Sequence, residues 1–438
     1  MKRLTLDDLR EALPDLDELR PIFDHLLACS EPDPARAWAG SGQLDTVGSR
    51  LLPADLAMSD VTAIATREAE RMGEMYAIIG RAAEALASGD RLAAGEAFLA
   101  AAALEEGRER ADRAEAYATA AFKAVRDERD QGPAALALRR SARAARALGR
   151  LDVALSRYGE AYEAGRAISD VRGTAEAAIG AGNVLEEQGL WSESAAWYHT
   201  AIESLAALDG PLTERWHAYL NLHIVARSRS ALEESLDWLK KAEAEAEAAG
   251  DAAIAAPFLS NARAQLQMAR GAFEDAAEHL REALAGTANA RARVSFRLNL
   301  AEALLALGRV LDAVEHAREA EREAIRSGTI PKLPEVYRLL GRIAATEGNP
   351  DAFVFFERAL ELVLERNLPV IEEALTLHAY AEAERRNGDE EAASHLAATA
   401  KERLEAVGLT HMRQDWADVY GPEPDEVSSP PHGEDHAE

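Results

Sequence analysis

The sequence predicts an all-α protein built as a solenoid of about eight stacked helical hairpins. A small residue is followed four positions later by an aromatic or apolar residue and three positions after that by alanine, as in Ser194, Tyr198 and Ala201. In most copies a glycine stands five residues ahead, as Gly189 does. The copies recur roughly every 40 residues, and such a period accommodates two helices of about 15 residues with two turns. Self-similarity of this kind is the signature of repeat architectures.

The eight copies share the same spacing and cover most of the chain. They are Ala94, Phe98, Ala101; Ala154, Tyr158, Ala161; Ser194, Tyr198, Ala201; Ser235, Leu239, Ala242; Ala276, Leu280, Ala283; Ala313, Ala317, Ala320; Ala352, Phe356, Ala359; and Ala393, Ala397, Ala400. Because residues at these spacings share one helix face, each set is expected to be the buried side of the second helix of a hairpin.

The third copy shows how one hairpin is specified. Gly189 is expected to end the first helix, because glycine accepts the left-handed conformation that lets the chain turn. Gly182, seven residues earlier, lets the two helices approach closely, and the ring of Tyr198 fills the space beside it. The fourth copy departs from this pattern, since His223 replaces the small residue and Ser230 replaces the turn glycine.

The interval between Gly89 and Gly149 is 60 residues and therefore holds an additional helix, expected at about residues 110–126. This helix is either half of a degenerate repeat or a break between two parts of the solenoid. The sequence leaves both alternatives open.

The segment from Gly182 to Trp191, followed by Ser194, Tyr198 and Ala201, resembles the tetratricopeptide repeat. The resemblance covers about residues 75–410 and implies a right-handed superhelix with a concave groove lined mostly by the first helix of each pair. These repeats are near 40 residues rather than the common 34, as in kinesin light chains and the sensor regions of some bacterial regulatory ATPases. We expect the hairpins to wind into an open coil that leaves its inner wall free.

Four regions are predicted along the chain. Residues 1–58 form a short helical and irregular segment, and residues 59–408 form the repeat solenoid, opening with a helix at about residues 59–87. Residues 409–420 form a helix that caps the open end of the stack. The proline, glycine, serine and acidic residues of 421–438 indicate a disordered acidic tail.

The composition restricts the partners. The formal net charge is −28, from 77 acidic and 49 basic residues, and such a field repels nucleic acid and anionic membrane surfaces. The single cysteine, Cys29, excludes an internal disulfide framework and a cysteine-rich zinc site. The N-terminus lacks the apolar run of a secretory signal, and no stretch is apolar enough to span a bilayer. A cytoplasmic location is therefore expected.

Basic residues and asparagines at expected groove positions are the candidate binding residues. Arg139, Arg143 and Arg146 are four and three residues apart, so they share one helix face. The other candidates are Asn183, Asn221, Asn299, Arg338 and Arg342. Such residues resemble the way some tetratricopeptide proteins clamp a peptide carboxylate, which implies a partner with acidic or C-terminal carboxylate groups. In the alternative interpretation, the arginines pair with carboxylates of adjacent helices.

No motif in the sequence indicates catalysis. A zinc-protease helix, a phosphate-binding glycine loop and a nucleophile elbow are all absent from the sequence, and no metal or cofactor is predicted. The pattern favours a non-enzymatic scaffold that holds a peptide or partner protein in its groove. The alternative is a regulatory sensor, in which a small ligand or peptide in the groove changes the superhelix and thereby controls a separate effector protein.

Overall fold

The computed structural model describes residues 74–75, 77–82, 84–108 and 110–406. Throughout these ranges the chain is helical apart from short connections. The helices are α6 (Arg91–Gly107), α7 (Ala111–Val125), α8 (Gly132–Ala147), α9 (Leu151–Ala167), α10 (Val171–Glu187), α11 (Trp191–Leu205), α12 (Thr213–Ser228), α13 (Leu232–Ala248), α14 (Ala252–Ala269), α15 (Phe273–Gly286), α16 (Ala290–Ala306), α17 (Val310–Ser327), the 3₁₀ turn η2 (Ile330–Lys332), α18 (Leu333–Thr346), α19 (Asp351–Arg366), α20 (Val370–Asn387) and α21 (Glu390–Ala406). The expected regions 1–58, 409–420 and 421–438 lie outside the described residues, as does most of the expected helix at 59–87.

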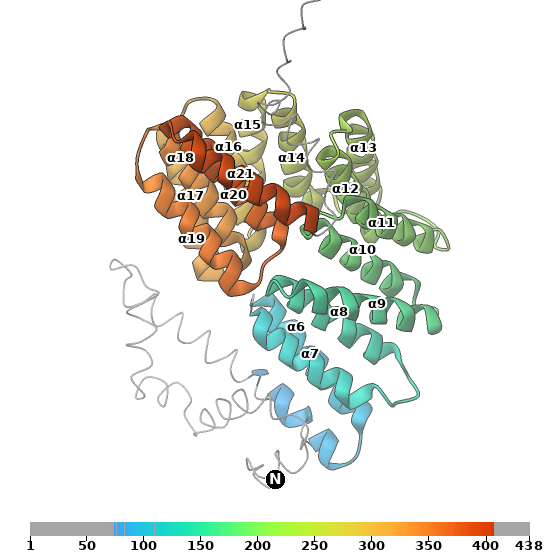
Figure 1. Cartoon of the computed structure of the whole chain (residues 1–438). Coiled ribbons are helices and arrows are strands. Elements are labelled where there is room, and N and C mark those ends of the chain that lie inside the picture. The colour runs from blue at the N-terminus through green and yellow to red at the C-terminus, as the bar shows by residue number, and fades with distance from the viewer. Residues whose placement is uncertain (1–73, 76, 83, 109, 407–438) are drawn as a thin grey trace, which may run out of the picture.

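The helices pack as sequential antiparallel hairpins that stack into a right-handed superhelical solenoid (Figure 1). The fold predicted from the repeats is therefore confirmed. The turn at Gly189 is also confirmed, because this residue has a φ of +78°. Ser230 takes the same left-handed conformation, with a φ of 57°, at the turn where the sequence lacks glycine.

In several hairpins an aromatic side chain of the second helix packs on a small residue of the first helix. Tyr158 and Tyr198 are both buried, as the spacing predicts. A Cβ atom added at Gly182 would lie 2.5 Å from Cε1 of Tyr198, and one at Gly341 would lie 2.8 Å from Cε1 of Phe356. Such distances are shorter than any van der Waals contact, so glycine is required where these rings cross the facing helix.

The additional helix is present as α7 and forms a hairpin with α6. Helix α6 contacts α8 in the same way that α8 contacts α10, so it occupies the position of a first helix. Phe98 and Ala101 also share one core cluster with Ile78 and Ala82 of the preceding helix, as their assignment to a second helix predicts. Helix α6 therefore packs against the helices on both sides of it. Residues 110–126 complete a repeat and do not interrupt the stack.

The superhelix curves until its C-terminal hairpins touch the turns of α8–α9 and α10–α11 (Figure 1). The loop after α19 places Leu368 beside Gly149, where an added Cβ would lie 3.0 Å from Cδ2 of Leu368. Leu190 and Trp191 pack against the cluster around Ile371 and Leu404. A cavity of about 490 Å³ lies in this seam. The expected open coil is therefore wrong at this point, because the curvature summed over the intervening hairpins brings distant units together.

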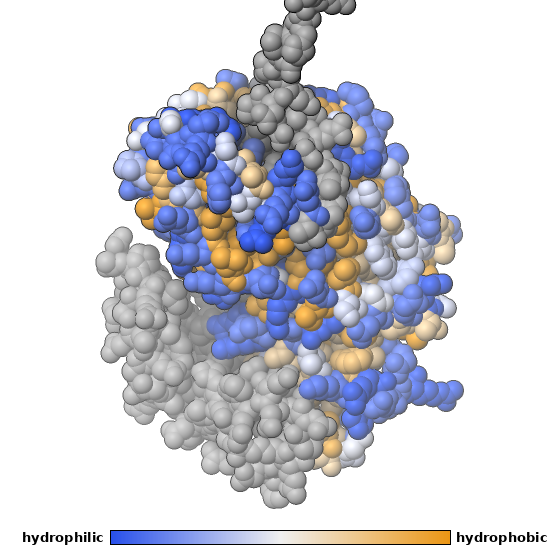
Figure 2. Space-filling view, viewed as in Figure 1, coloured by the Kyte–Doolittle hydropathy of each residue, from blue (hydrophilic) through white to orange (hydrophobic). Residues whose placement is uncertain are grey.

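The face seen in Figure 2 carries many hydrophilic residues, with apolar surface visible near α19. Val354 and Leu364 on this helix have exposed fractions of 60% and 71%. Single exposed apolar side chains of this kind are ordinary on a protein surface.

Candidate functional site

Polar side chains of the first helices form a ladder of contacts between neighbouring hairpins. The residues come from α8, α10, α12, α14, α16, α18 and α20, which are the first helices of successive pairs. Every residue that the sequence singled out lies on this ladder, and each one is bonded to another helix.

The three arginines of α8 divide between the two neighbouring first helices. Arg139 is buried, and its Nη1 lies 3.1 Å from Oδ2 of Asp170, the residue that caps the N-terminus of α10. Arg143 is half exposed and lies 3.7 Å from Glu106 of α6. Nη1 of Arg146 lies 3.3 Å from Oε1 of Glu187, at the end of α10. The arginines therefore pair with carboxylates of adjacent helices, and their role in binding a partner stays a prediction.

The asparagines form two equivalent bridges. Nδ2 of Asn221 donates to Oδ1 of Asn183 at 2.7 Å, which links α12 to α10. Nδ2 of Asn299 donates to Oδ1 of Asn261 at 2.8 Å, which links α16 to α14. Both pairs are 38 residues apart. Sequence reasoning missed Asn261, although this repeated separation was a signal that could have identified it.

The two arginines of α18 connect this helix to α16 and to α20, the first helices of the neighbouring hairpins. Nη1 of Arg338 donates to Oε2 of Glu372 on α20 at 2.8 Å. Nη1 of Arg342 donates to Oε1 of Glu302 on α16 at 2.7 Å. The ladder therefore continues in both directions from α18.

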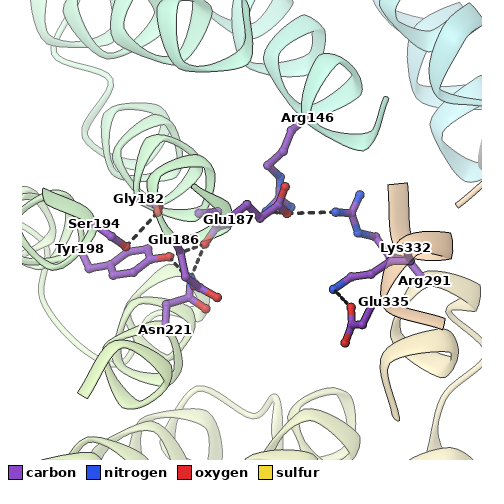
Figure 3. A network of polar contacts seen from close by, with 11 residues as sticks. Arg146, Gly182, Glu186, Glu187, Ser194, Tyr198, Asn221, Arg291, Lys332 and Glu335 are labelled. Atoms are coloured by element: carbon purple, nitrogen blue, oxygen red, sulfur yellow. Dashed lines mark hydrogen bonds and ion pairs between the residues drawn. The ribbon is translucent and has the colours of Figure 1, made fainter. Parts of the chain in front are cut away.

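The ladder also joins α10 to α16, two helices that are far apart in the sequence. Nη2 of Arg291, in the first turn of α16, lies 3.0 Å from Oε1 of Glu187, 104 residues away. Figure 3 shows Arg146 and Arg291 reaching Glu187 from different helices, with the Lys332–Glu335 pair next to Arg291. Neither Glu187 nor Arg291 was predicted, because a contact across the superhelix leaves no spacing signal within a repeat.

Glu186 adds a second carboxyl group beside Glu187, in contact with the buried Tyr198. Oη of Tyr198 lies 2.8 Å from Oδ1 of Asn183 and 3.0 Å from Oε2 of Glu186 (Figure 3). The Tyr198 hydroxyl donates in both contacts, so its one proton is shared between the two acceptors. Burial, together with the charge of Glu187, raises the pKa of Glu186 to about 7. The groove thus carries a carboxyl group that changes charge near neutral pH.

Two further findings limit the chemistry of the described residues. No group of three or more histidine, cysteine or acidic side chains within them is arranged to hold a metal ion. None of their helices combines the length and apolar character needed to span a membrane.

The geometry of paired helices, turn glycines and ring-on-glycine packing defines a helical repeat protein. The chain has the fold of tetratricopeptide-type repeat proteins, which solved structures share. A Rap protein complexed with Competence and Sporulation Factor is 14% identical, with a TM-score of 0.54, over 92% of this chain and 99% of that one. NprR in complex with its cognate peptide NprX is 12% identical, with a TM-score of 0.51, over 89% and 99%. No protein-family model and no curated protein matches the sequence.

Proposed function

We propose that this protein is a non-enzymatic adaptor that binds an extended peptide, or an extended segment of a partner protein, along the inner wall of its superhelix. The polar ladder carries this proposal. It presents guanidinium, carboxamide and carboxylate groups at regular helix-to-helix steps, and an extended chain offers hydrogen-bond donors and acceptors at regular steps as well.

The structural neighbours support the proposal. NprR was solved with its cognate peptide, and the Rap protein was solved with Competence and Sporulation Factor. The net charge of −28 disfavours nucleic acid as the ligand of the groove, so a peptide or protein is the better candidate.

A randomised peptide library displayed against the purified chain tests the proposal. We expect enrichment of a defined sequence whose affinity falls at least about tenfold in Asn183→Ala/Asn221→Ala, because removing groups that hydrogen-bond a ligand costs about 1–2 kcal/mol. Asn387→Ala changes an exposed residue at the end of α20 and is the matched control. Failure to enrich any sequence, or equal binding by the groove variant and the control, would contradict the proposal.

A second candidate is the regulatory sensor, and the seam favours it. Because the C-terminal hairpins contact the turns beside Gly149 and Leu190, a ligand that enters the groove acts on walls that already touch. A peptide obtained from the library should then change the radius of gyration measured by small-angle scattering. Unchanged scattering at saturating peptide would favour the adaptor over the sensor.

A further inference from the structure

Two guanidinium groups from opposite walls of the groove share one carboxylate oxygen. Arg146 in the last turn of α8 and Arg291 in the first turn of α16 lie 3.3 Å and 3.0 Å from Oε1 of Glu187. Within the described ranges neither arginine has another carboxylate within 4.0 Å. Two positive charges therefore converge on a single negative charge, and Nε of Arg146 is buried without a hydrogen-bond partner.

Glu187 is a poor permanent occupant of this position. It is the last residue of α10, where the exposed carbonyl groups give the helix end a partial negative charge that disfavours a carboxylate. Its side chain is 32% exposed, so it has an open path to solvent. Only Oε1 contacts the arginines, whereas a carboxylate that enters between them can offer one oxygen to each guanidinium.

A third cation and a second carboxyl group lie beside this site. Lys332 lies near Arg291 and pairs with Glu335 at 2.8 Å. Glu186, the neighbouring carboxyl group, accepts a hydrogen bond from the Tyr198 hydroxyl at 3.0 Å and interacts electrostatically with Arg146, but within the described residues it forms no ion pair with either arginine. Glu187 is therefore the occupant that an incoming carboxylate would replace.

We propose that Arg146 and Arg291 form a carboxylate-binding site at the centre of the groove, and that Glu187 is an internal occupant which a carboxylate of the bound peptide displaces. This inference rests on the proposed peptide-binding function. The carboxylate comes either from the C-terminus of the peptide or from an aspartate or glutamate side chain. Because the ligand takes the place of Glu187 between the two arginines, binding keeps α8 and α16 joined and breaks only the link that Glu187 makes from α10.

The site is tested first without a peptide, using sodium acetate as the probe. Glu187→Gln keeps the size of the side chain but removes the internal charge, so both guanidinium groups should accept acetate. We expect the melting temperature of this variant to rise with acetate relative to chloride at equal ionic strength. The wild type should respond less, and Glu187→Gln/Arg291→Met should not respond. An equal response of all three proteins would overturn the proposal. The exposed Glu193→Gln on α11 is the control.

The second measurement uses a peptide obtained from the library. Glu187→Gln should bind it more tightly, by about tenfold if Glu187 occupies the site nine-tenths of the time, because the apparent dissociation constant scales inversely with the competent fraction. An amidated peptide and a peptide with its acidic residues replaced identify which carboxylate is bound. If Asn183→Ala/Asn221→Ala weakens binding but neither carboxylate matters, the inference fails and the proposed function stands. If no peptide binds, the proposed function fails and the acetate measurement still decides whether the site exists.

Discussion

Hairpins α10–α11 and α12–α13 solve one packing problem in opposite ways. Both are fastened by a serine of the second helix that donates to a carbonyl of the first, Ser194 to Gly182 at 2.9 Å and Ser235 to His223 at 3.1 Å. In α10–α11 the first helix contributes a glycine and the second contributes a tyrosine ring. In α12–α13 the first helix contributes His223 and the second contributes the smaller Leu239.

The difference shows that the repeat preserves interhelical volume and not the identity of each residue. It also changes where the polar groups lie. The ring of Tyr198 carries its hydroxyl through to Asn183 and Glu186 on the inner wall. His223 instead keeps its polar atoms between the helices, where Nδ1 lies 2.9 Å from Oγ of Ser235. Only the first arrangement contributes to the groove.

The largest effect is expected when the missing side chain is added to the glycine of α10. Gly182→Ala places a Cβ 2.5 Å from the buried Tyr198 ring and should lower the free energy of unfolding by about 3 kcal/mol, as overpacked cores do. Gly159→Ala on α9 is the matched control, because a Cβ there meets no atom within 4 Å. It should stabilise the helix by up to about 1 kcal/mol. Chemical denaturation compares the two, and equal effects would contradict the ring-on-glycine packing.

A smaller effect is expected when the bulky residue of α12 is removed. His223→Ala leaves a cavity and deprives Ser235 of a partner, which should cost about 2 kcal/mol. Adding Leu239→Tyr should recover part of this loss by supplying a ring from the second helix, as in α10–α11. No recovery would indicate that volume alone does not decide the packing.

His223 also predicts a dependence on pH. Burial lowers the pKa of His223 from 6.5 to about 4, so the folded state binds its proton less readily than the unfolded state does. The stability of the wild type should therefore fall as the pH drops from about 6.5 to about 4. Denaturation at both pH values should show a smaller fall in His223→Ala.

The smallest effect concerns the turns of the same two hairpins. Ser230 has a φ of 57°, in the conformation that Gly189 adopts at the preceding turn. Ser230→Gly should stabilise by about 0.5 kcal/mol, because the relief of left-handed strain slightly exceeds the entropy that glycine loses on folding. Gly189→Ser should have the opposite sign. A loss of stability in Ser230→Gly, measured by thermal unfolding, would show that the serine side chain stabilises this turn.

The sequence predicted which helices carry the candidate site, but it did not predict which of those helices meet across the superhelix. Spacing within a repeat placed Arg146, Asn183 and Arg338 on first helices, and in the structure each one contacts a neighbouring first helix. The same spacing did not identify Glu187 or Arg291, which meet across 104 residues. Their encounter depends on the angle between every intervening pair of hairpins.

The sequence by itself determined the hairpins, their turns and the residues buried between paired helices. Those features depend on contacts within about 40 residues, and spacing, ring size and glycine at Gly182 and Gly189 specify them locally. Only the tertiary structure decided that α6 also acts as a first helix, that the seam closes at Gly149 and Leu368, and that two arginines share Glu187. Each interface adds a small rotation, and the sum of these rotations decides which distant walls come together.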